Sequence, residues 1–144
     1  MEFKIDNHQE EYLNSINFME NRVNEIIKGL SNDLIWFVNY PSIYTFGPQT
    51  IESDLKIKDL FPVYETSRGG KLTYHGPGQR TVYLMIDLNK RTKDIKKFVR
   101  KIELVILKTL SFYNIEGELN NDHHGVFVQK NMRAHKIASI GLKF

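Results

Sequence analysis

The string RGGKLTYHGPGQ occupies residues 68–79 and contains four glycines and one proline. Backbone this rich in glycine can turn sharply and approach a ligand closely. An arginine, a threonine, a tyrosine and a histidine lie among the glycines, so several polar groups can converge on one space. Two tight hairpin turns whose polar side chains face water would have the same composition, because glycine-rich turns are common. Composition alone therefore leaves a binding segment and a pair of turns equally open.

The order of these residues resembles the signature of the lipoyl(octanoyl) transferase family, in which Arg-Gly-Gly-x-x-Thr-Tyr-His-Gly-Pro-Gly-Gln precedes a strand ending in Asp-Leu, here Asp87-Leu88. PSIYTFG (41–47) is similar to a turn of that family. GVFV (125–128) together with KIASIG (136–141) is similar to its second motif. Three departures indicate a divergent member: Asn39-Tyr40 before the proline of the turn, Phe127 in place of a tryptophan, and Leu84 in place of a proline.

Bulk composition sets the broad class of the chain. A length of 144 residues suits one domain, and 41% hydrophobic with 26% charged residues is ordinary for a globular protein. The N-terminus has no signal-peptide pattern, and no apolar run approaches the roughly 20 residues of a membrane span, so we expect a cytoplasmic protein without a membrane partner. With 20 basic residues largely interleaved among 17 acidic ones, charge does not predict nucleic-acid binding. The chain has no cysteine, which excludes a cysteine nucleophile among these residues.

Hydrophobic periodicity predicts two helices among several strands. Apolar residues spaced by three and four from Tyr12 to Leu30 indicate a first helix, with Asp6 and Gln9 resembling a capping box and Gly29 at its end. A second helix is expected from about Thr92 to Tyr113. The expected strands are 34–39, 43–46, 63–66, 80–88, 126–128 and 137–142, the last two joined by a turn at Lys130-Asn131. Helices and strands do not alternate strictly, which favours an α/β sandwich with a mixed or mostly antiparallel sheet.

The resemblance to the lipoyl(octanoyl) transferase family also implies a fold, a reaction and partners that the hydrophobic pattern alone does not. It implies a biotin/lipoate protein ligase-like α/β domain over residues 1–144, lacking its C-terminal third. It implies an acyltransferase of lipoate biosynthesis that moves an octanoyl group from octanoyl-acyl carrier protein to a lysine of lipoyl domains. Those acceptors belong to 2-oxoacid dehydrogenases and to the glycine cleavage H protein. The group passes through a cysteine thioester, no cofactor is needed, and the family cysteine lies in a later Pro-Cys-Gly-type motif absent from this sequence.

The same resemblance assigns the site residues. Lys136 takes the position of the lysine that lowers the pKa of that cysteine, although the cysteine is not in this chain. The backbone amides at 139–141 are expected to hold a developing oxyanion. The residues expected to bind substrate are Arg68, Gly69, Gly70, Lys71, Leu72, Thr73, Tyr74, His75, Ser139, Ile140 and Gly141.

Lys136 can also be examined from the residues alone. If its strand alternates, Lys136 shares a face with Ala138 and Ile140, and not with Ser139. An ordinary surface lysine at the start of a strand is the alternative interpretation.

Two weaker patterns remain. His123 and His124 beside Asp122 would point to opposite faces of a strand and have no partner at a telling distance, so we expect a polar loop and no metal site. Basic residues outnumber acids heavily between Lys90 and Lys108. They form either a solvated helix face or a surface that steers acidic carrier proteins and lipoyl domains.

Two other functions stay open beside the transferase. One is a non-catalytic remnant or binding fragment of that enzyme, which the absence of cysteine keeps open. The less favoured one is a lipoate- or biotin-protein ligase. Lipoate ligases typically have His-Asp-x-Gly-Asn where this chain has HGPGQ at 75–79.

Overall fold

The structure is a computed structural model that describes residues 1–57, 59–91, 93–120 and 124–143. The chain divides into two compact units, Met1–Leu88, to which Lys143 also belongs, and Asn89–Leu142. Each unit is described by itself below. The expectation of a single domain over residues 1–144 stays a prediction.

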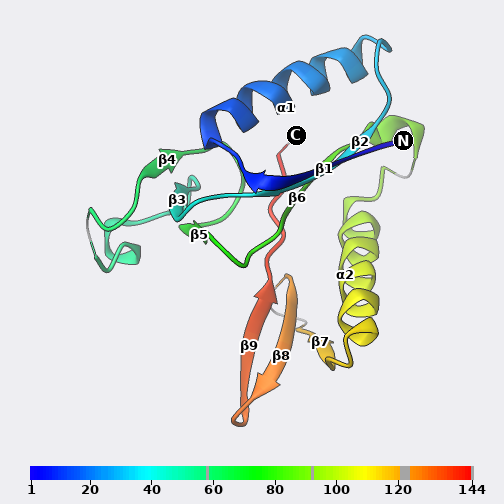
Figure 1. Ribbon diagram of the computed structural model, residues 1–144. Helices are drawn as coiled ribbons and strands as arrows, with labels where there is room; N and C mark the ends of the chain where they lie inside the picture. Colours follow the sequence, from blue (N-terminus) through cyan, green and yellow to red (C-terminus); the bar gives the residue numbers. More distant parts are fainter. Residues whose placement is uncertain (58, 92, 121–123, 144) are drawn as a thin grey trace. The chain divides into compact units, whose positions relative to one another are not determined.

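The first unit contains two three-stranded sheets and one long helix (Figure 1). In the first sheet, β2 (Leu34–Asn39) lies between β1 (Glu2–Gln9), which is parallel to it, and β6 (Thr81–Met85), which is antiparallel. In the second sheet, β3 (Ile43–Phe46) lies between parallel β4 (Val63–Glu65) and antiparallel β5 (Thr73–His75). The 3-10 turns η1 (Glu52–Asp54) and η2 (Leu88–Lys90) follow β3 and β6. Both sheets are mixed, as expected.

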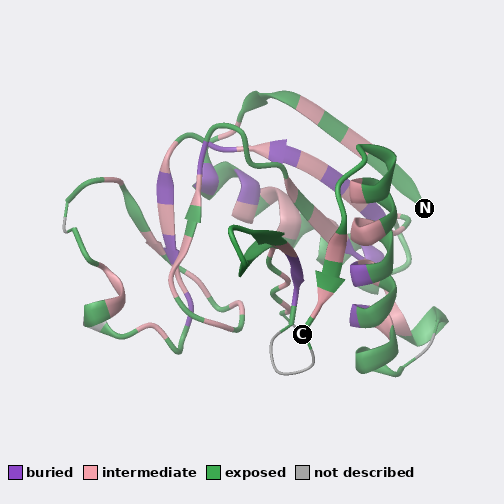
Figure 2. Cartoon of the chain, turned by 90° about the horizontal axis from the view of Figure 1, so that it is seen from below, coloured by how far each residue is buried: buried purple, intermediate pink, exposed green. Residues whose placement is uncertain are grey.

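Helix α1 (Tyr12–Ile27) covers one face of the first sheet and closes the core of this unit. Strand β2 alternates strictly between buried and half-buried residues, and the alternation is visible along the strand in Figure 2. Tyr12 and Ile26 are the helix residues buried in the core, whereas Ile27 is 75% exposed. Gly29 has a φ of 72° and ends the helix where the sequence predicted. The buried members of the core are Tyr12, Ile26, Leu34, Trp36, Val38, Tyr40, Ile43 and Met85.

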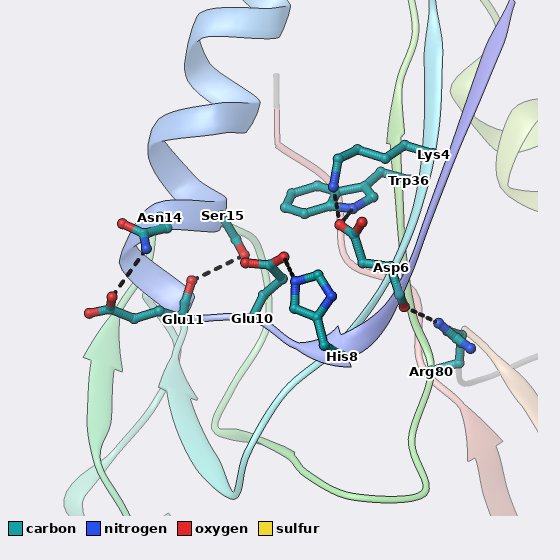
Figure 3. A network of polar contacts seen from close by, with 9 residues as sticks. All are labelled: Lys4, Asp6, His8, Glu10, Glu11, Asn14, Ser15, Trp36 and Arg80. Atoms are coloured by element: carbon teal, nitrogen blue, oxygen red, sulfur yellow. Dashed lines mark hydrogen bonds and ion pairs between the residues drawn. The ribbon is translucent and has the colours of Figure 1, made fainter.

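The expectation that the chain begins with a helix is wrong, because β1 precedes it. Asp6 and Gln9 lie in this strand and do not cap α1, whose N-cap residue is Glu11. The Asp6 carboxylate accepts a hydrogen bond from Trp36 Nε1 at 2.6 Å and pairs with Lys4, whose ammonium lies 4.7 Å from the Trp36 ring centroid (Figure 3). Polar residues of β1 therefore face the core while Phe3 is 66% exposed, which is the reverse of the usual strand pattern.

The second unit contains α2 (Ile95–Phe112) and an antiparallel sheet of β7 (Gly117–Leu119), β8 (Val126–Lys130) and β9 (Arg133–Ala138). Asp94 caps α2 by accepting a hydrogen bond from the Lys97 amide at 3.0 Å. Thr92, the expected helix start, lies outside the described residues. Val99 and Glu103 are the buried residues of the helix, and the helix packs against β7 and β8.

The last strand is displaced from its expected position at 137–142 to Arg133–Ala138. Asn131 and Met132 have φ values of 52° and 58°, and Lys130 pairs directly with Arg133. These are the features of a two-residue type I′ hairpin turn, which starts the return strand at once. Residues 139–143 follow β9 without regular secondary structure. Among the described residues, no helix is both long and apolar enough to cross a membrane.

Candidate functional site

The segment 68–75 lies against β3, the strand formed by the PSIYTFG motif. Its last three residues are β5, in which Thr73 pairs with Thr45 and His75 pairs with Ile43. The half-buried Arg68 guanidinium lies beside the paired strands β3 and β5. Its Nη2 donates to the backbone oxygen of Thr45 at 2.9 Å and to Thr45 Oγ1 at 2.7 Å. The two motifs that the sequence separates by twenty residues therefore form one structure.

Two glycines allow this close approach. Gly70 has a φ of 97°, and its carbonyl oxygen would lie 2.1 Å from a Cβ atom added at Gly47. Any side chain at Gly47 would push the loop away from the end of β3. Arg68 Nη1 adds two further bonds, to the carbonyl oxygens of Gly69 at 3.1 Å and Lys71 at 3.0 Å. The loop is thus fixed by its own arginine, with Gly69 and Lys71 exposed on its outer side.

His75 is enclosed between two threonine hydroxyls. Its Nε2 lies 3.3 Å from Thr45 Oγ1, and its Nδ1 lies 3.4 Å from Thr81 Oγ1. Burial, followed by the nearby charge of Arg68, lowers the pKa of His75 to about 4. The imidazole is therefore neutral at neutral pH, and it does not supply a proton readily to a ligand.

Buried tyrosines lie behind this group. The Tyr40 ring meets His75 edge-on, with 5.8 Å between ring centroids, and the Tyr40 hydroxyl lies 3.0 Å from that of Tyr83. Burial raises the pKa of Tyr83 and also that of Tyr12, which reaches about 12. Burial lowers the pKa of Arg68, although an arginine remains charged at any physiological pH. The inner side of the segment 68–75 is thus lined by neutral tyrosines and by the Arg68 guanidinium.

Tyr74 points to the opposite face of β5 and is 36% exposed. Its hydroxyl lies 2.9 Å from Ser42 Oγ, and its ring packs against Tyr44 and Phe61, with centroids 5.9 and 5.7 Å away. A Cβ atom at Gly76 would lie 2.1 Å from the Tyr74 hydroxyl, so the glycine after β5 is needed for this placement. An aromatic surface therefore lies on the outer side of the string.

An open hollow of about 420 Å³ adjoins the other end of the string. The GPG turn supplies Pro77 and Gly78, and the neighbouring strands supply amide side chains. None of the residues from 68 to 75 lines it. Its full lining is Asn7, Gln9, Asn39, Pro77, Gly78, Gln79 and Arg80.

In the second unit, Lys136 pairs across the hairpin with Phe127, and its ammonium lies 5.2 Å from the Phe127 ring centroid. The expectation that Lys136 shares a face with Ala138 is wrong. Ala138 pairs with Val126, the neighbour of Phe127, so a β-bulge at Ile137 reverses the alternation. Lys136 is exposed and lies over an aromatic ring, whereas Ala138 faces the side of the fully buried Val126.

Gly125, the first residue of the GVFV motif, is held from two sides. Its amide donates to Glu103 Oε1 at 3.2 Å, and Glu103 is 7% exposed. Its φ is 113°, and a Cβ atom would lie 2.4 Å from the carbonyl oxygen of Ala138. A buried carboxylate of α2 therefore anchors the strand pair that presents Lys136.

The structure thus groups Arg68, Thr73 and His75 around Thr45 in the first unit. Lys136 and the segment 139–141 belong to the second unit, and their assignment to substrate stays a prediction. Sequence reasoning missed Thr45 and Glu103 as members of this framework. The threonine inside PSIYTFG was a signal, because it is the one aliphatic hydroxyl residue within the strand 43–46, whose other members are apolar or aromatic.

The other expected patterns can now be located. His123 and Asp122 lie outside the described residues, and within the described part of the chain no three His, Asp or Glu side chains form a group suited to a metal. On α2, Lys96, Lys97, Arg100 and Lys101 are all exposed.

Comparison with known proteins gives the family that the sequence resembles, over nearly the whole chain. A family model described as the lipoyl protein ligase A/B catalytic domain matches residues 11–144. The octanoyltransferases of Anaplasma phagocytophilum and of Wolbachia pipientis are 40% and 42% identical to the chain over 99% of its length, which covers 69% of each relative. The octanoyltransferase of Bartonella tribocorum is 39% identical, with 62% of its length covered. The chain thus spans about two thirds of these relatives, or slightly less.

Solved structures agree on the fold. LipL1 of P. falciparum in complex with lipoate has a TM-score of 0.59 at 19% identity, covering 92% of this chain and 41% of that one. A bi-partite lipoate protein ligase from Thermoplasma acidophilum has a TM-score of 0.59 at 14% identity, covering 93% of this chain and 54% of that one. The expected lipoate ligase-like fold is confirmed.

Proposed function

The chain belongs to the lipoyl protein ligase A/B catalytic domain family, and we propose that the protein containing it transfers an octanoyl group to a lysine of lipoyl domains. The family relationship expected from the RGGKLTYHGPGQ string is confirmed, and so is the enzyme class, since the curated relatives are octanoyltransferases. One observation supports the proposal most strongly: two of these relatives are 40% and 42% identical over 99% of the chain.

In this proposal the acyl group lies against residues 68–75 and 139–141. The fixed loop of Arg68 supports this role, because its guanidinium and the turns of Gly47 and Gly70 give a rigid backbone to which a ligand can bind at small entropic cost. The aromatic cluster of exposed Tyr74 with half-buried Tyr44 and Phe61 offers apolar contact for an acyl chain.

The reaction proceeds in two acyl transfers. A thiolate attacks the octanoyl thioester carbonyl, an oxyanion forms and collapses, and the donor thiol leaves with a proton. The acceptor lysine amine then attacks the new thioester, the C–S bond breaks, and an amide forms as the amine gives up a proton to the released thiolate. Lys136 has the role of stabilising the attacking thiolate and of carrying the proton. The thiol is not among the 144 residues of this sequence, so they are assigned binding and activation only.

The proposed donor is octanoyl-acyl carrier protein, and the proposed acceptors are lipoyl domains of 2-oxoacid dehydrogenases and the glycine cleavage H protein, all in the cytoplasm. The basic residues on the solvent-exposed face of α2 support the proposal that the donor is an acidic protein. From Lys90 to Lys108 basic residues outnumber acids by eight to two. Both acids are committed to local contacts, Asp94 as the helix cap and Glu103 in the bond to Gly125. Lys97 and Arg100 form ion pairs with these two acids at 3.6 and 3.5 Å, but their side chains are 76% and 57% exposed, so both still contribute to a basic surface that can attract an acidic partner.

The test uses the full-length protein that the gene encodes, mixed with an unmodified lipoyl domain. One reaction contains octanoyl-acyl carrier protein without ATP, and the other contains lipoate with ATP and Mg²⁺. The proposal expects modification of the lipoyl domain by the first mixture alone, detected by intact mass. Modification that requires ATP would establish a ligase instead, and binding of the donor without any transfer would establish a non-catalytic fragment.

A further inference from the structure

The Thr45 hydroxyl lies at the centre of the first unit's candidate site. Thr45 is fully buried in β3, and its Oγ1 lies 2.7 Å from Arg68 Nη2 and 3.3 Å from His75 Nε2. Arg68 begins the segment 68–75 and His75 ends it. A single hydroxyl from a different motif therefore contacts both ends of the segment proposed to bind the acyl group.

We propose that Thr45 is the positioning residue of this segment: its hydroxyl holds the Arg68 guanidinium in place and fixes His75 as the tautomer protonated at Nδ1. The part of this inference that concerns substrate rests on the proposed function. The part that concerns the tautomer rests on geometry alone.

The direction of each hydrogen bond follows from what the groups can donate. A guanidinium only donates, so Thr45 Oγ1 must accept from Arg68 Nη2. The threonine has one proton left, and its nearest other acceptor is His75 Nε2 at 3.3 Å, with the Thr73 carbonyl oxygen at 3.5 Å. If Nε2 accepts, the neutral ring has its proton on Nδ1 and donates to Thr81 Oγ1 at 3.4 Å. Donation then runs in one direction from Arg68 through Thr45 and His75 to Thr81.

The charges in this region agree with that direction. Burial and the charge of Arg68 lower the pKa of His75 to about 4, so the ring is neutral and one of its nitrogens can accept. The Thr45 backbone oxygen also accepts from Arg68 Nη2, at 2.9 Å, so this one residue receives two bonds from the guanidinium. Losing the hydroxyl would leave a half-buried donor and a half-buried acceptor less well paired, which costs more than the loss of an exposed bond.

Two substitutions separate the hydroxyl from the shape of the side chain. Thr45→Val keeps the branched shape and removes the hydroxyl. Thr45→Ser keeps the hydroxyl and removes a methyl group. A residue needed only for packing would be better replaced by valine, whereas a positioning hydroxyl would be better replaced by serine.

The first experiment records the ¹⁵N shifts of the His75 ring by NMR on the full-length protein at pH 7. The wild type and Thr45→Ser are expected to show the Nδ1-protonated tautomer, and Thr45→Val is expected to lose it. Thr81→Val is the comparison variant: it removes the proposed acceptor of the Nδ1 proton and leaves the Thr45 contact in place, and it is expected to keep the Nδ1-protonated tautomer. A wild-type ring protonated at Nε2 overturns the inference whether or not any variant folds, and so does an unchanged Thr45→Val spectrum.

The second experiment measures octanoyl transfer by the full-length protein. Thr45→Val is expected to raise KM for octanoyl-acyl carrier protein about tenfold with kcat nearly unchanged, and Thr45→Ser is expected to restore KM to within about twofold of the wild type. Equal loss of kcat in both variants would contradict positioning and indicate a general defect of folding. A wild type without transfer activity would refute the proposed function, while the NMR result would still decide the role of Thr45.

Discussion

The ammonium of Lys136 lies 5.2 Å from the centroid of the Phe127 ring, its direct partner across the β8–β9 hairpin. The ring holds the cation without neutralising it, because the attraction comes from the face of the aromatic system. The contact with the ring gives the Lys136 ammonium a defined position, which the proposed stabilisation of a thiolate requires.

Replacement of Lys136 tests that role. Lys136→Met keeps the length of the side chain and removes the charge, so octanoyl transfer by the full-length protein should fall by roughly 100-fold or more in kcat. Lys130→Met, an exposed lysine of the same hairpin, is the control and should leave the rate unchanged. Equal rates for the wild type and Lys136→Met would exclude the assignment.

Gly125 should be intolerant of any side chain. Gly125→Ala combines a φ of 113° with a Cβ atom 2.4 Å from the Ala138 carbonyl oxygen, and it should lower the free energy of unfolding by about 2–3 kcal/mol. Gly29→Ala is the control, because Gly29 has a φ of 72° but open space around it, and it should cost only about 1 kcal/mol. Urea denaturation measures both. Equal losses would show that the contact with Ala138 has no effect.

The sequence predicted the central strands accurately and failed where local pattern and tertiary contact disagree. The strands 34–39 and 43–46 have the expected bounds, because short apolar runs between turn residues have few alternatives. Strand β1 was missed because Lys4 and Asp6 face the core, where Trp36 satisfies them, and Phe3 faces outward.

The site was predictable only in part. The order of the residues in the string 68–79 identified this segment as a candidate binding segment. Thr45 could be recognised as a shared partner only once β3 and β5 were paired. The face that Lys136 shares was predicted wrongly because one bulge residue, Ile137, places Ala138 on the opposite face from Lys136, and a single sequence shows no sign of a bulge.

The pH dependence of stability should show the buried His75. Its pKa is about 4 in the folded chain and about 6.5 when unfolded, so between these values the unfolded chain binds more protons. Stability therefore falls as the pH drops from about 6.5 towards 4, by on the order of 2 kcal/mol after allowance for the partial exposure of the ring. His75→Gln should reduce this loss. Urea denaturation at pH 7 and pH 4.5 measures the free energy of unfolding of the wild type and of His75→Gln. An equal loss of this free energy in the two proteins would contradict the prediction.

Charge reversal tests the basic face of α2. Lys97→Glu with Arg100→Glu should weaken binding of octanoyl-acyl carrier protein about tenfold at low salt and flatten its dependence on ionic strength. Lys130→Glu with Arg133→Glu reverses two exposed charges at the hairpin end of the same unit, and it should change affinity by less than about twofold. Isothermal titration at two salt concentrations measures both pairs. An unchanged affinity for the α2 pair would exclude this docking surface.

The central claim is the transfer of octanoyl to a lipoyl lysine. The measurement that tests it most directly is the intact mass of a lipoyl domain after incubation with the full-length protein and octanoyl-acyl carrier protein, beside a domain whose acceptor lysine is replaced by arginine. The account predicts one added octanoyl group on the first domain and none on the second. An unmodified first domain, with the protein folded and the donor intact, would contradict it.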